Sequence, residues 1–275
     1  MSTNNPSLTQ LLVQQPTINP YRYAAYELWN RIKWDLNPES WRSRRKLKQL
    51  KDKCQGSKAV IVCNGPSLLK SDLSLLEGVF TFGLNKINLL FDKSSFRPSC
   101  IVAINPFVIE QNAEFYNQTD IPLFLDSYGV RFVRSRKNTT FIPSSSQPKF
   151  AKDCSLNVYG GYTVTFVAMQ LAFHMGFKHV ALIGCDHNFV TKGPANLAVA
   201  SGEKDENHFA PNYFAGGVMW HLPDLEGSEL AYRMARDMYQ AAEKSIVNAT
   251  DGGCLELFPR MSLEQFIHSS ASSVK

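Results

Sequence analysis

Polar side chains follow successive apolar runs of this chain, at the points where those runs end. Asparagine amides both donate and accept hydrogen bonds, and a glycine lets the backbone approach a ligand closely. These properties suit the base, ribose and phosphate of a nucleotide. The positions that we predict to form one such pocket are Asn64, Gly65, Ser67, Asn85, Asn105 and Asp186. Each asparagine taken alone more often marks a turn or a helix cap.

A glycine pair, Gly160-Gly161, precedes an apolar helical pattern. The first N–H groups of a helix lack intrahelical partners and lie at its positive end, so they bind anions. We therefore predict a phosphate site there, to which the hydroxyl of Thr163 adds a donor. The alternative is that the two glycines only punctuate a loop.

Histidine supplies the candidate base. His221 lies just before the helical pattern at 227–244, where it could swing over the pocket and take a proton near neutral pH. His187 and His208 are the alternatives, whereas His174 and His179 flank a predicted helix end and are expected to be structural.

The usual metal and phosphate signatures are missing from the sequence. It has no Asp-x-Asp pair, no Walker lysine, no kinase-type glycine loop and no Cys/His spacing typical of zinc. Phosphoryl transfer from ATP depends heavily on a metal ion. We therefore expect no metal, and a reaction in which a phosphate already held by N–H groups and hydroxyls is the leaving group. Glycosyl transfer from a nucleotide-monophosphate sugar is such a reaction.

The elements that must position these residues alternate between strand and helix from residue 59 onwards, which is typical of an α/β fold. The run Ala59–Cys63 is continuously apolar and rich in β-branched residues, as in a parallel strand buried on both faces. We predict strands over 59–63, 79–83, 100–104, 122–126, 139–142, 179–185 and near 246–249, and helices over 67–76, 106–117, 162–175, 227–244 and 262–268. Ser67 is the expected N-cap of the first helix. The expected fold is Rossmann-like, with a mainly parallel sheet and helices on both faces.

Two segments depart from this alternation. Residues 188–220 are rich in Gly, Ala, Asn and Pro, and we interpret them as a lid over the strand ends, a plain surface insertion being the alternative. Residues 1–56 form a basic helical extension with one helical pattern over 21–36 and a second after Asn37. The remaining residues, 57–275, form the predicted nucleotide-binding and transferase domain.

The extension carries the basic character of the chain, since residues 31–58 hold ten Lys or Arg against three Asp or Glu. Residues 21–58 could contact anionic lipid or a lipid-linked acceptor, or they could pack on the core or form an oligomer contact. We expect no nucleic acid partner, because no recognisable nucleic-acid fold is present. The six cysteines form no C-x-x-C pair, the N-terminus is polar, and no run reaches the roughly 20 apolar residues of a membrane span. The expected location is the cytoplasm, with peripheral contact at the inner face of the membrane.

Taken in order, these motifs resemble the MptE-like family (6-hydroxymethylpterin pyrophosphokinase-like) and its relatives, the bacterial CMP-sialic acid-dependent sialyltransferases of glycosyltransferase family 42. The resemblance covers roughly residues 57–268 and ends in a pattern more typical of the MptE-like branch often associated with surface-polysaccharide genes. The segments that carry it are Cys63–Leu68, Asn85, Asn105-Pro106, Gly160-Gly161, Gly184–Asp186, His221, Asn248–Gly253 and Phe258–Leu263.

The resemblance implies an inverting, metal-independent glycosyltransferase that moves an acidic sugar from a CMP donor to a glycan or lipid-linked glycan acceptor, as in lipopolysaccharide synthesis. The asparagine positions would hold the cytidine nucleotide, Gly160 and Gly161 would lie near the phosphate, and His221 would take the proton of the acceptor hydroxyl. The sialyltransferases hold the leaving phosphate with tyrosines in and after the segment matching 184–189. Here His187 or Tyr213 takes that role, or the donor differs.

Two other functions stay open. A pterin pyrophosphokinase of the MptE type would use ATP and magnesium, with Asp186, Asp224 and Asp251 as scattered candidate ligands. A non-catalytic nucleotide-sugar binding protein would use the basic extension to reach a partner.

Overall fold

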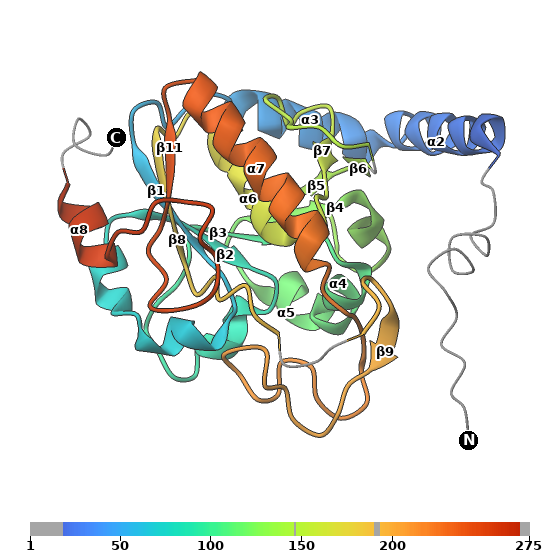
Figure 1. Cartoon of the computed structure of the whole chain (residues 1–275). Coiled ribbons are helices and arrows are strands. Elements are labelled where there is room, and N and C mark those ends of the chain that lie inside the picture. Colours follow the sequence, from blue (N-terminus) through green and yellow to red (C-terminus); the bar gives the residue numbers. More distant parts are fainter. Residues whose placement is uncertain (1–18, 146, 190–192, 270–275) are drawn as a thin grey trace, which may run out of the picture.

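A single seven-stranded parallel sheet forms the centre of the protein. The computed structural model describes residues 19–145, 147–189 and 193–269. The strand order is β11-β8-β1-β2-β3-β4-β5, and every neighbouring pair is parallel (Figure 1). The strands are β1 (Lys58–Val62), β2 (Phe80–Leu84), β3 (Cys100–Ala103), β4 (Leu123–Asp126), β5 (Thr139–Ile142), β8 (His179–Ile183) and β11 (Ser245–Asn248). The predicted α/β, Rossmann-like fold is confirmed.

Alternate residues of the strands enter two separate cores, one on each face of the sheet. Ala59 and Ile61 of β1 belong to one core, whereas Val60 and Val62 belong to the other, and all four are fully buried. A strand covered on both faces must be apolar at every position, which explains the unbroken apolar run in the sequence.

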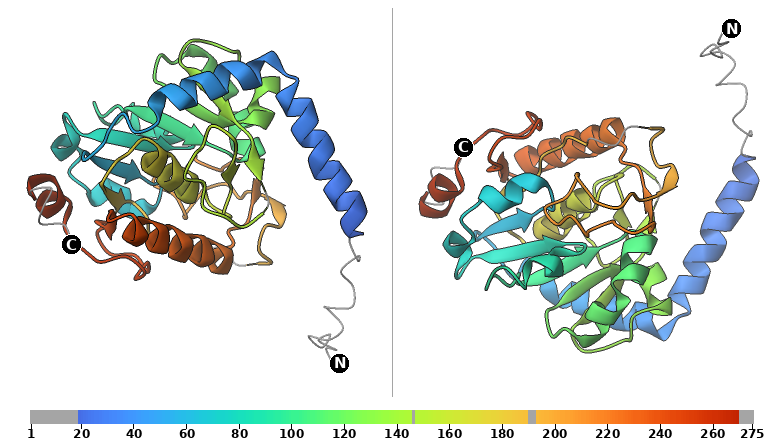
Figure 2. Two further views of the ribbon diagram at one scale, coloured as in Figure 1. Left: turned by 90° about the horizontal axis from the view of Figure 1, so that it is seen from above. Right: turned by 90° about the horizontal axis from the view of Figure 1, so that it is seen from below.

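Helices cover both faces (Figures 1 and 2). One face packs against α3 (Pro38–Leu50), α6 (Val164–His174) and α7 (Leu225–Ala241). The other packs against α4 (Pro106–Gln111), α5 (Ala113–Gln118), α8 (Leu263–His268) and the 3-10 helices η1 (Pro66–Lys70), η2 (Leu73–Leu76) and η3 (Ile87–Leu90). A further 3-10 helix, η4 (Ser127–Arg131), follows β4.

Three predicted elements differ in detail. The helix predicted over 67–76 is the pair η1 and η2, because the carboxylate of Asp72 accepts the N–H of Ser74 and starts a new turn. The N-cap of η1 is Gly65, so the expectation that Ser67 caps this helix is wrong. The helix predicted over 106–117 is interrupted at Asn112, between α4 and α5. The strand predicted over 179–185 ends at Ile183, since Gly184 takes a positive φ of 64°.

Two helices precede the sheet. In α2 (Pro20–Asp35) and α3 the capping residues are Asn19 and Asn37, each followed by a proline at the first helical position. The hydroxyl of Ser43 on α3 accepts the N–H of Phe141, 2.9 Å away, and so covers the exposed edge of β5. By contrast, α2 projects away from the body of the protein (Figures 1 and 2). The part of the predicted extension at residues 1–18 lies outside the described residues.

The predicted lid contains regular structure. Strands β9 (Ala198–Ala200) and β10 (Met219–His221) pair as an antiparallel hairpin, and a buried aromatic cluster of the lid joins the second core. The N–H of Phe209 donates to the backbone oxygen of Asn64, 2.9 Å away, which seats the lid on the end of β1. Residues 190–192 of the lid lie outside the described part. A short parallel pair, β6 (Ser144–Ser145) with β7 (Val158–Tyr159), precedes α6.

Across the described residues, none of the helices combines the length and apolar character that crossing a membrane requires.

Candidate functional site

The strand order places a crevice between β1 and β8. The chain builds the sheet outward from β1 to β5 and then returns to add β8 on the other side of β1. The loops that leave these two strands therefore diverge at their carboxyl ends, and ligands of open α/β sheets bind at such points. A pocket opens there, with about 710 Å³ of space that includes its solvent-filled mouth.

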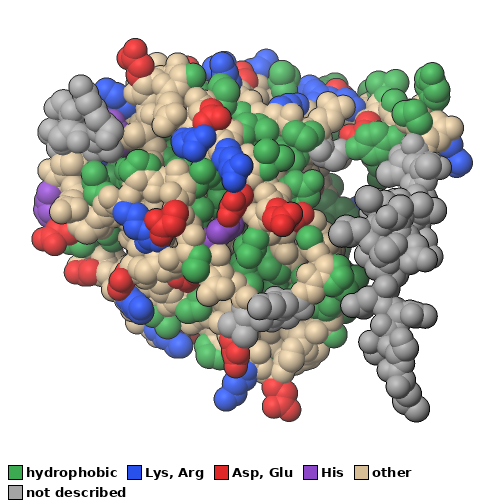
Figure 3. Space-filling view, in the orientation of Figure 1, with side chains coloured by type: hydrophobic (Ala, Val, Ile, Leu, Met, Phe, Trp, Pro, Cys, Tyr) green, Lys and Arg blue, Asp and Glu red, His purple; other side chains and the backbone are tan. Residues whose placement is uncertain are grey.

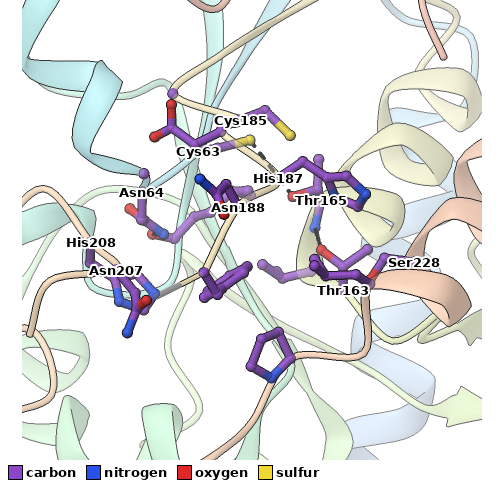
Figure 4. Close-up of a pocket in the computed structure, with 18 of the residues that line it drawn as sticks. Cys63, Asn64, Thr163, Thr165, Cys185, His187, Asn188, Asn207, His208 and Ser228 are labelled. Carbon is purple, nitrogen blue, oxygen red and sulfur yellow. Dashed lines mark hydrogen bonds between the residues drawn. The ribbon is translucent and has the colours of Figure 1, made fainter. Parts of the chain in front are cut away.

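The pocket brings together six of the residues predicted from the sequence: Asn64, Gly65, Asn85, Thr163, Asp186 and His187. Figure 4 shows Asn64 on one side, across from Thr163 and Ser228, the latter on α7. No lysine or arginine is among the described residues that line the pocket. A phosphate bound here would therefore meet hydroxyl, amide and backbone N–H groups.

The amide of Asn64 is half satisfied. Its Nδ2 donates to the backbone oxygen of Leu84, 3.0 Å away, whereas its buried Oδ1 has no hydrogen-bond partner in the described structure. Next to it, the N–H of Ser67 donates to Oδ2 of Asp186 at 3.0 Å, and the buried Oγ of Ser67 also lacks a partner. A buried polar atom without a partner costs about 1–3 kcal/mol, which a ligand that supplies the missing hydrogen bond would recover.

The start of α6 reaches the pocket, but the glycine pair does not line it. Thr163 caps the helix, its Oγ1 accepting the N–H of Thr165 at 3.3 Å, and both threonines line the pocket. Gly161 has a φ of 58°, and an added Cβ would lie 2.5 Å from Phe166. Gly160 and Gly161 thus form the turn that precedes α6 and sets its direction. Direct contact of Gly160 or Gly161 with a phosphate stays a prediction.

Asn105 and His221 contact each other beside the pocket and are not among its lining residues. The Oδ1 of Asn105 accepts the N–H groups of Phe107 and Val108, so its Nδ2 faces Nδ1 of His221 at 3.3 Å. Because Nδ2 can only donate, Nδ1 of His221 accepts, and the proton of the neutral ring lies on Nε2. In this arrangement Nε2 is a donor and cannot accept a proton.

His208, named in the sequence only as an alternative, lies on the lid and lines the pocket. Its Nδ1 is 2.7 Å from Oδ2 of Asp205, and its ring stacks on Tyr213 with centroids 4.0 Å apart. A carboxylate at Nδ1 holds the proton there and leaves the lone pair of Nε2 free to accept another. The short spacing Asp205-x-x-His208 was the available sequence signal.

The charge of Asp205 is well supported. Burial would raise the pKa of this carboxyl, but hydrogen bonds from His208 and from the N–H groups of Asn207 and Phe214 outweigh it and hold the pKa below its ordinary value. Asp205 therefore stays ionised at neutral pH and can stabilise a protonated His208.

Two further contacts involve His187, which lines the pocket, and Lys86, which does not. His187 has a φ of 51°, and its Nε2 lies 3.3 Å from a carboxylate oxygen of Glu229 on α7. Lys86 follows β2, and its Nζ donates to the backbone oxygen of Tyr213 at 2.8 Å, which ties the lid to the sheet. Burial lowers the pKa of Lys86 to about 8, although the charge of Asp205 opposes this shift.

No group of three or more His, Cys, Asp or Glu side chains within residues 19–145, 147–189 and 193–269 is arranged to hold a metal ion.

The fold and the pocket define a Rossmann-like α/β protein with a polar crevice at its strand ends. Comparison with known families places it further: residues 36–192 match the family described as 6-hydroxymethylpterin diphosphokinase MptE-like. Because this match spans more than half of the 275 residues, the chain belongs to the MptE-like family. The match begins just before α3, earlier than the resemblance indicated, and it ends before His208 and His221. Searches of curated proteins and of solved structures give no significant match.

Proposed function

We propose that this protein is a nucleotide-dependent transferase that activates an acceptor hydroxyl, and specifically a glycosyltransferase that moves an acidic sugar from a CMP donor to a glycan or lipid-linked glycan in surface-polysaccharide synthesis. The observation that carries the proposal is a lid histidine, His208, held by Asp205 with Nε2 free and placed in the wall of a polar pocket at the β1/β8 crevice.

The donor half of the proposal uses neutral polar groups. The unpaired Oδ1 of Asn64 can accept a hydrogen bond from an amino group such as the one on cytosine. The hydroxyls of Thr163 and Thr165, with the N–H of Val164 at the start of α6, suit the phosphate. In this proposal the phosphate needs no divalent ion.

The reaction follows from these positions. Nε2 of His208 takes the proton of the acceptor hydroxyl while the oxygen of that hydroxyl bonds to the anomeric carbon of the donor sugar. The bond between that carbon and the phosphate oxygen breaks, and its electron pair leaves with CMP. Attack opposite to the leaving group inverts the anomeric centre. Asp205 stabilises the imidazolium that forms.

The family match favours a second candidate, a pterin diphosphokinase. The same base would then deprotonate the hydroxymethyl group of a pterin, its oxygen would attack the β-phosphorus of ATP, and AMP would leave. This reaction depends on magnesium, which separates it from the first. A nucleotide-sugar binding protein without catalysis is the third possibility.

Calorimetric titration with CMP, in EDTA and again with magnesium, tests the donor site. We expect binding of equal strength in both buffers. Release of CMP from CMP-activated sialic acid and related nonulosonic acids then tests turnover, with His208→Gln as the control. Magnesium-dependent AMP release from ATP and hydroxymethylpterin, with no CMP binding, would replace the first candidate by the second. Binding of CMP-sugars without turnover on any acceptor would favour the third.

A further inference from the structure

The helix α2 carries an exposed apolar stripe. Tyr21, Leu28, Trp29, Ile32 and Leu36 follow one another at helical spacing and are between 41% and 84% exposed. Figure 3 shows hydrophobic side chains gathered on this helix, where it projects from the body of the protein. Exposed apolar residues that share one face of a helix are typical of a docking surface.

The stripe continues onto α3 and there meets basic residues. The indole N–H of Trp41 donates to the backbone oxygen of Asp35 at 2.8 Å, which sets Trp41 beside Leu36. Trp41 is 64% exposed and borders a shallow cleft that Arg45 and Lys48 also line. We call this set, from Tyr21 to Lys48, the α2–α3 surface.

Among the side chains of this surface that form no ion pair with a described residue, the cations outnumber the carboxylates, of which Glu27 is the single example. Arg31 and Arg44 both pair with Asp35, so a single carboxylate offsets half of their combined charge. None of Arg22, Lys33, Arg45 and Lys48 forms an ion pair with a described residue. An exposed aromatic and aliphatic stripe flanked by free cations matches the interface of an anionic bilayer, where Trp and Tyr lie at headgroup level.

A second copy of the chain fits this surface less well. In an antiparallel two-fold pairing of α2 stripes, Arg22 of one copy would approach Lys33 of the other on the same flank, and like charges repel. We propose that the α2–α3 surface docks on an anionic lipid bilayer. This inference is independent of the reaction proposed above.

The test uses the full chain and two kinds of vesicle, pure phosphatidylcholine and an equal mixture of phosphatidylcholine with phosphatidylglycerol. We expect sedimentation with the anionic vesicles and weak binding to the neutral ones. Binding should be lost in 0.5 M salt, because the Debye length falls from about 10 Å at 0.1 M salt to about 3 Å at 1 M, and surface charge interactions weaken accordingly. Trp34 and Trp220 are buried, so a blue shift of tryptophan fluorescence would report Trp29 and Trp41.

Matched variants assign the binding to the surface. Leu28→Gln/Trp29→Gln should lower partitioning at least about tenfold, because it removes the apolar contact while keeping good helix formers. Leu69→Gln/Leu230→Gln removes two equally exposed leucines elsewhere and should leave partitioning unchanged. Arg45→Gln/Lys48→Gln should weaken binding to the anionic vesicles only. Circular dichroism and thermal unfolding would show that each variant keeps its fold.

Three results would overturn the proposal. The wild-type chain could fail to bind anionic vesicles at low salt. The two leucine-containing double variants could lose binding equally. Lastly, sedimentation in solution could reveal a dimer that Leu28→Gln/Trp29→Gln dissociates, with no vesicle binding, and this would assign the surface to a second copy.

Discussion

Gly65 lies against the carboxylate of Asp186 so closely that a Cβ at position 65 would be 2.0 Å from Oδ2. The φ of Gly65 is −68°, so its backbone conformation is open to any residue. Glycine is needed here for close approach: it lets the loop after β1 touch the loop after β8. This contact closes the floor of the pocket at the point where the strand order reverses.

Gly65→Ala should therefore destabilise the protein by at least about 2 kcal/mol, because the backbone oxygen of Gly184 and the half-buried carboxylate of Asp186 must move away from the added Cβ. Urea unfolding measures this change. Gly202→Ala, where a Cβ meets only Lys204 O at 3.9 Å, should change the free energy of unfolding by less than about 0.5 kcal/mol. Equal effects at the two positions would contradict the close-approach argument.

The roles of His208 and His221 can be separated. His208→Gln should lower kcat about 100-fold or more, since general-base catalysis contributes about 10²–10⁴. His221→Gln should cost at most about tenfold, because a glutamine can still accept from Asn105 and Nε2 is no base in the tautomer that this contact implies. Steady-state kinetics with a turned-over donor decides between them, and the reverse ranking would restore His221 as the base.

Asp205→Asn tests how His208 is held. With its oxygen at the Oδ1 position, the asparagine keeps the N–H bond of Asn207 and gives up that of Phe214. Its Nδ2 then takes the Oδ2 position, where it would donate to Nδ1 of His208 and move the ring proton to Nε2. We expect kcat to fall about as far as in His208→Gln, with nucleotide affinity retained. Nitrogen NMR shifts of the imidazole would report the tautomer. An unchanged tautomer with lost activity would mean that Asp205 acts in another way.

Ser67→Ala should have opposite effects on stability and on binding. Removing a buried hydroxyl without a partner should raise the free energy of unfolding by up to about 1 kcal/mol, yet lower nucleotide affinity if that hydroxyl meets the ligand. Ser40 on α3 has the same kind of unpaired, buried Oγ far from the pocket. Ser40→Ala should therefore give the stability gain alone. Calorimetry with CMP and urea unfolding measure both quantities, and unaltered affinity in Ser67→Ala would remove Ser67 from the site.

Lys86 predicts a pH dependence of stability. Its folded pKa of about 8 lies below the ordinary value of 10.5, so between these values the unfolded chain binds more protons. The free energy of unfolding of the wild type should accordingly rise, relative to Lys86→Met, as the pH increases from about 8 to 10.5, by on the order of 3 kcal/mol at most. Below pH 8 the difference should be constant. Urea unfolding of both proteins across this range is the measurement, and a difference that stays flat above pH 8 would contradict the lowered pKa.

The fold was predictable because burial of the strands on both faces constrains the residue types along them. A parallel strand buried on both faces needs unbroken apolar runs, and those runs located all seven strands to within a few residues. Helix ends were less predictable. A local hydrogen bond, such as the one that the N–H of Ser74 donates to Asp72, can interrupt a helix while the apolar pattern of the sequence continues through it. The strand ends also placed Asn64, Asn85 and Asp186 together, because parallel strands finish at one edge of the sheet.

The sequence by itself thus determined the α/β class, the family and the residues at the edge of the sheet, since periodicity and turn chemistry are local properties. Only the tertiary structure decided which histidine has an unprotonated Nε2 that can accept a proton. A hydrogen bond from Asn105, 116 residues before His221, sets the tautomer of His221, and no local pattern encodes that pairing. Asp205 and His208 are close in sequence, but the fold of the lid decides that Nδ1 of His208 meets the carboxylate. The tertiary structure likewise decided that Gly161 packs against α6 and that the stripe on α2 faces solvent, because burial depends on what the rest of the chain places alongside.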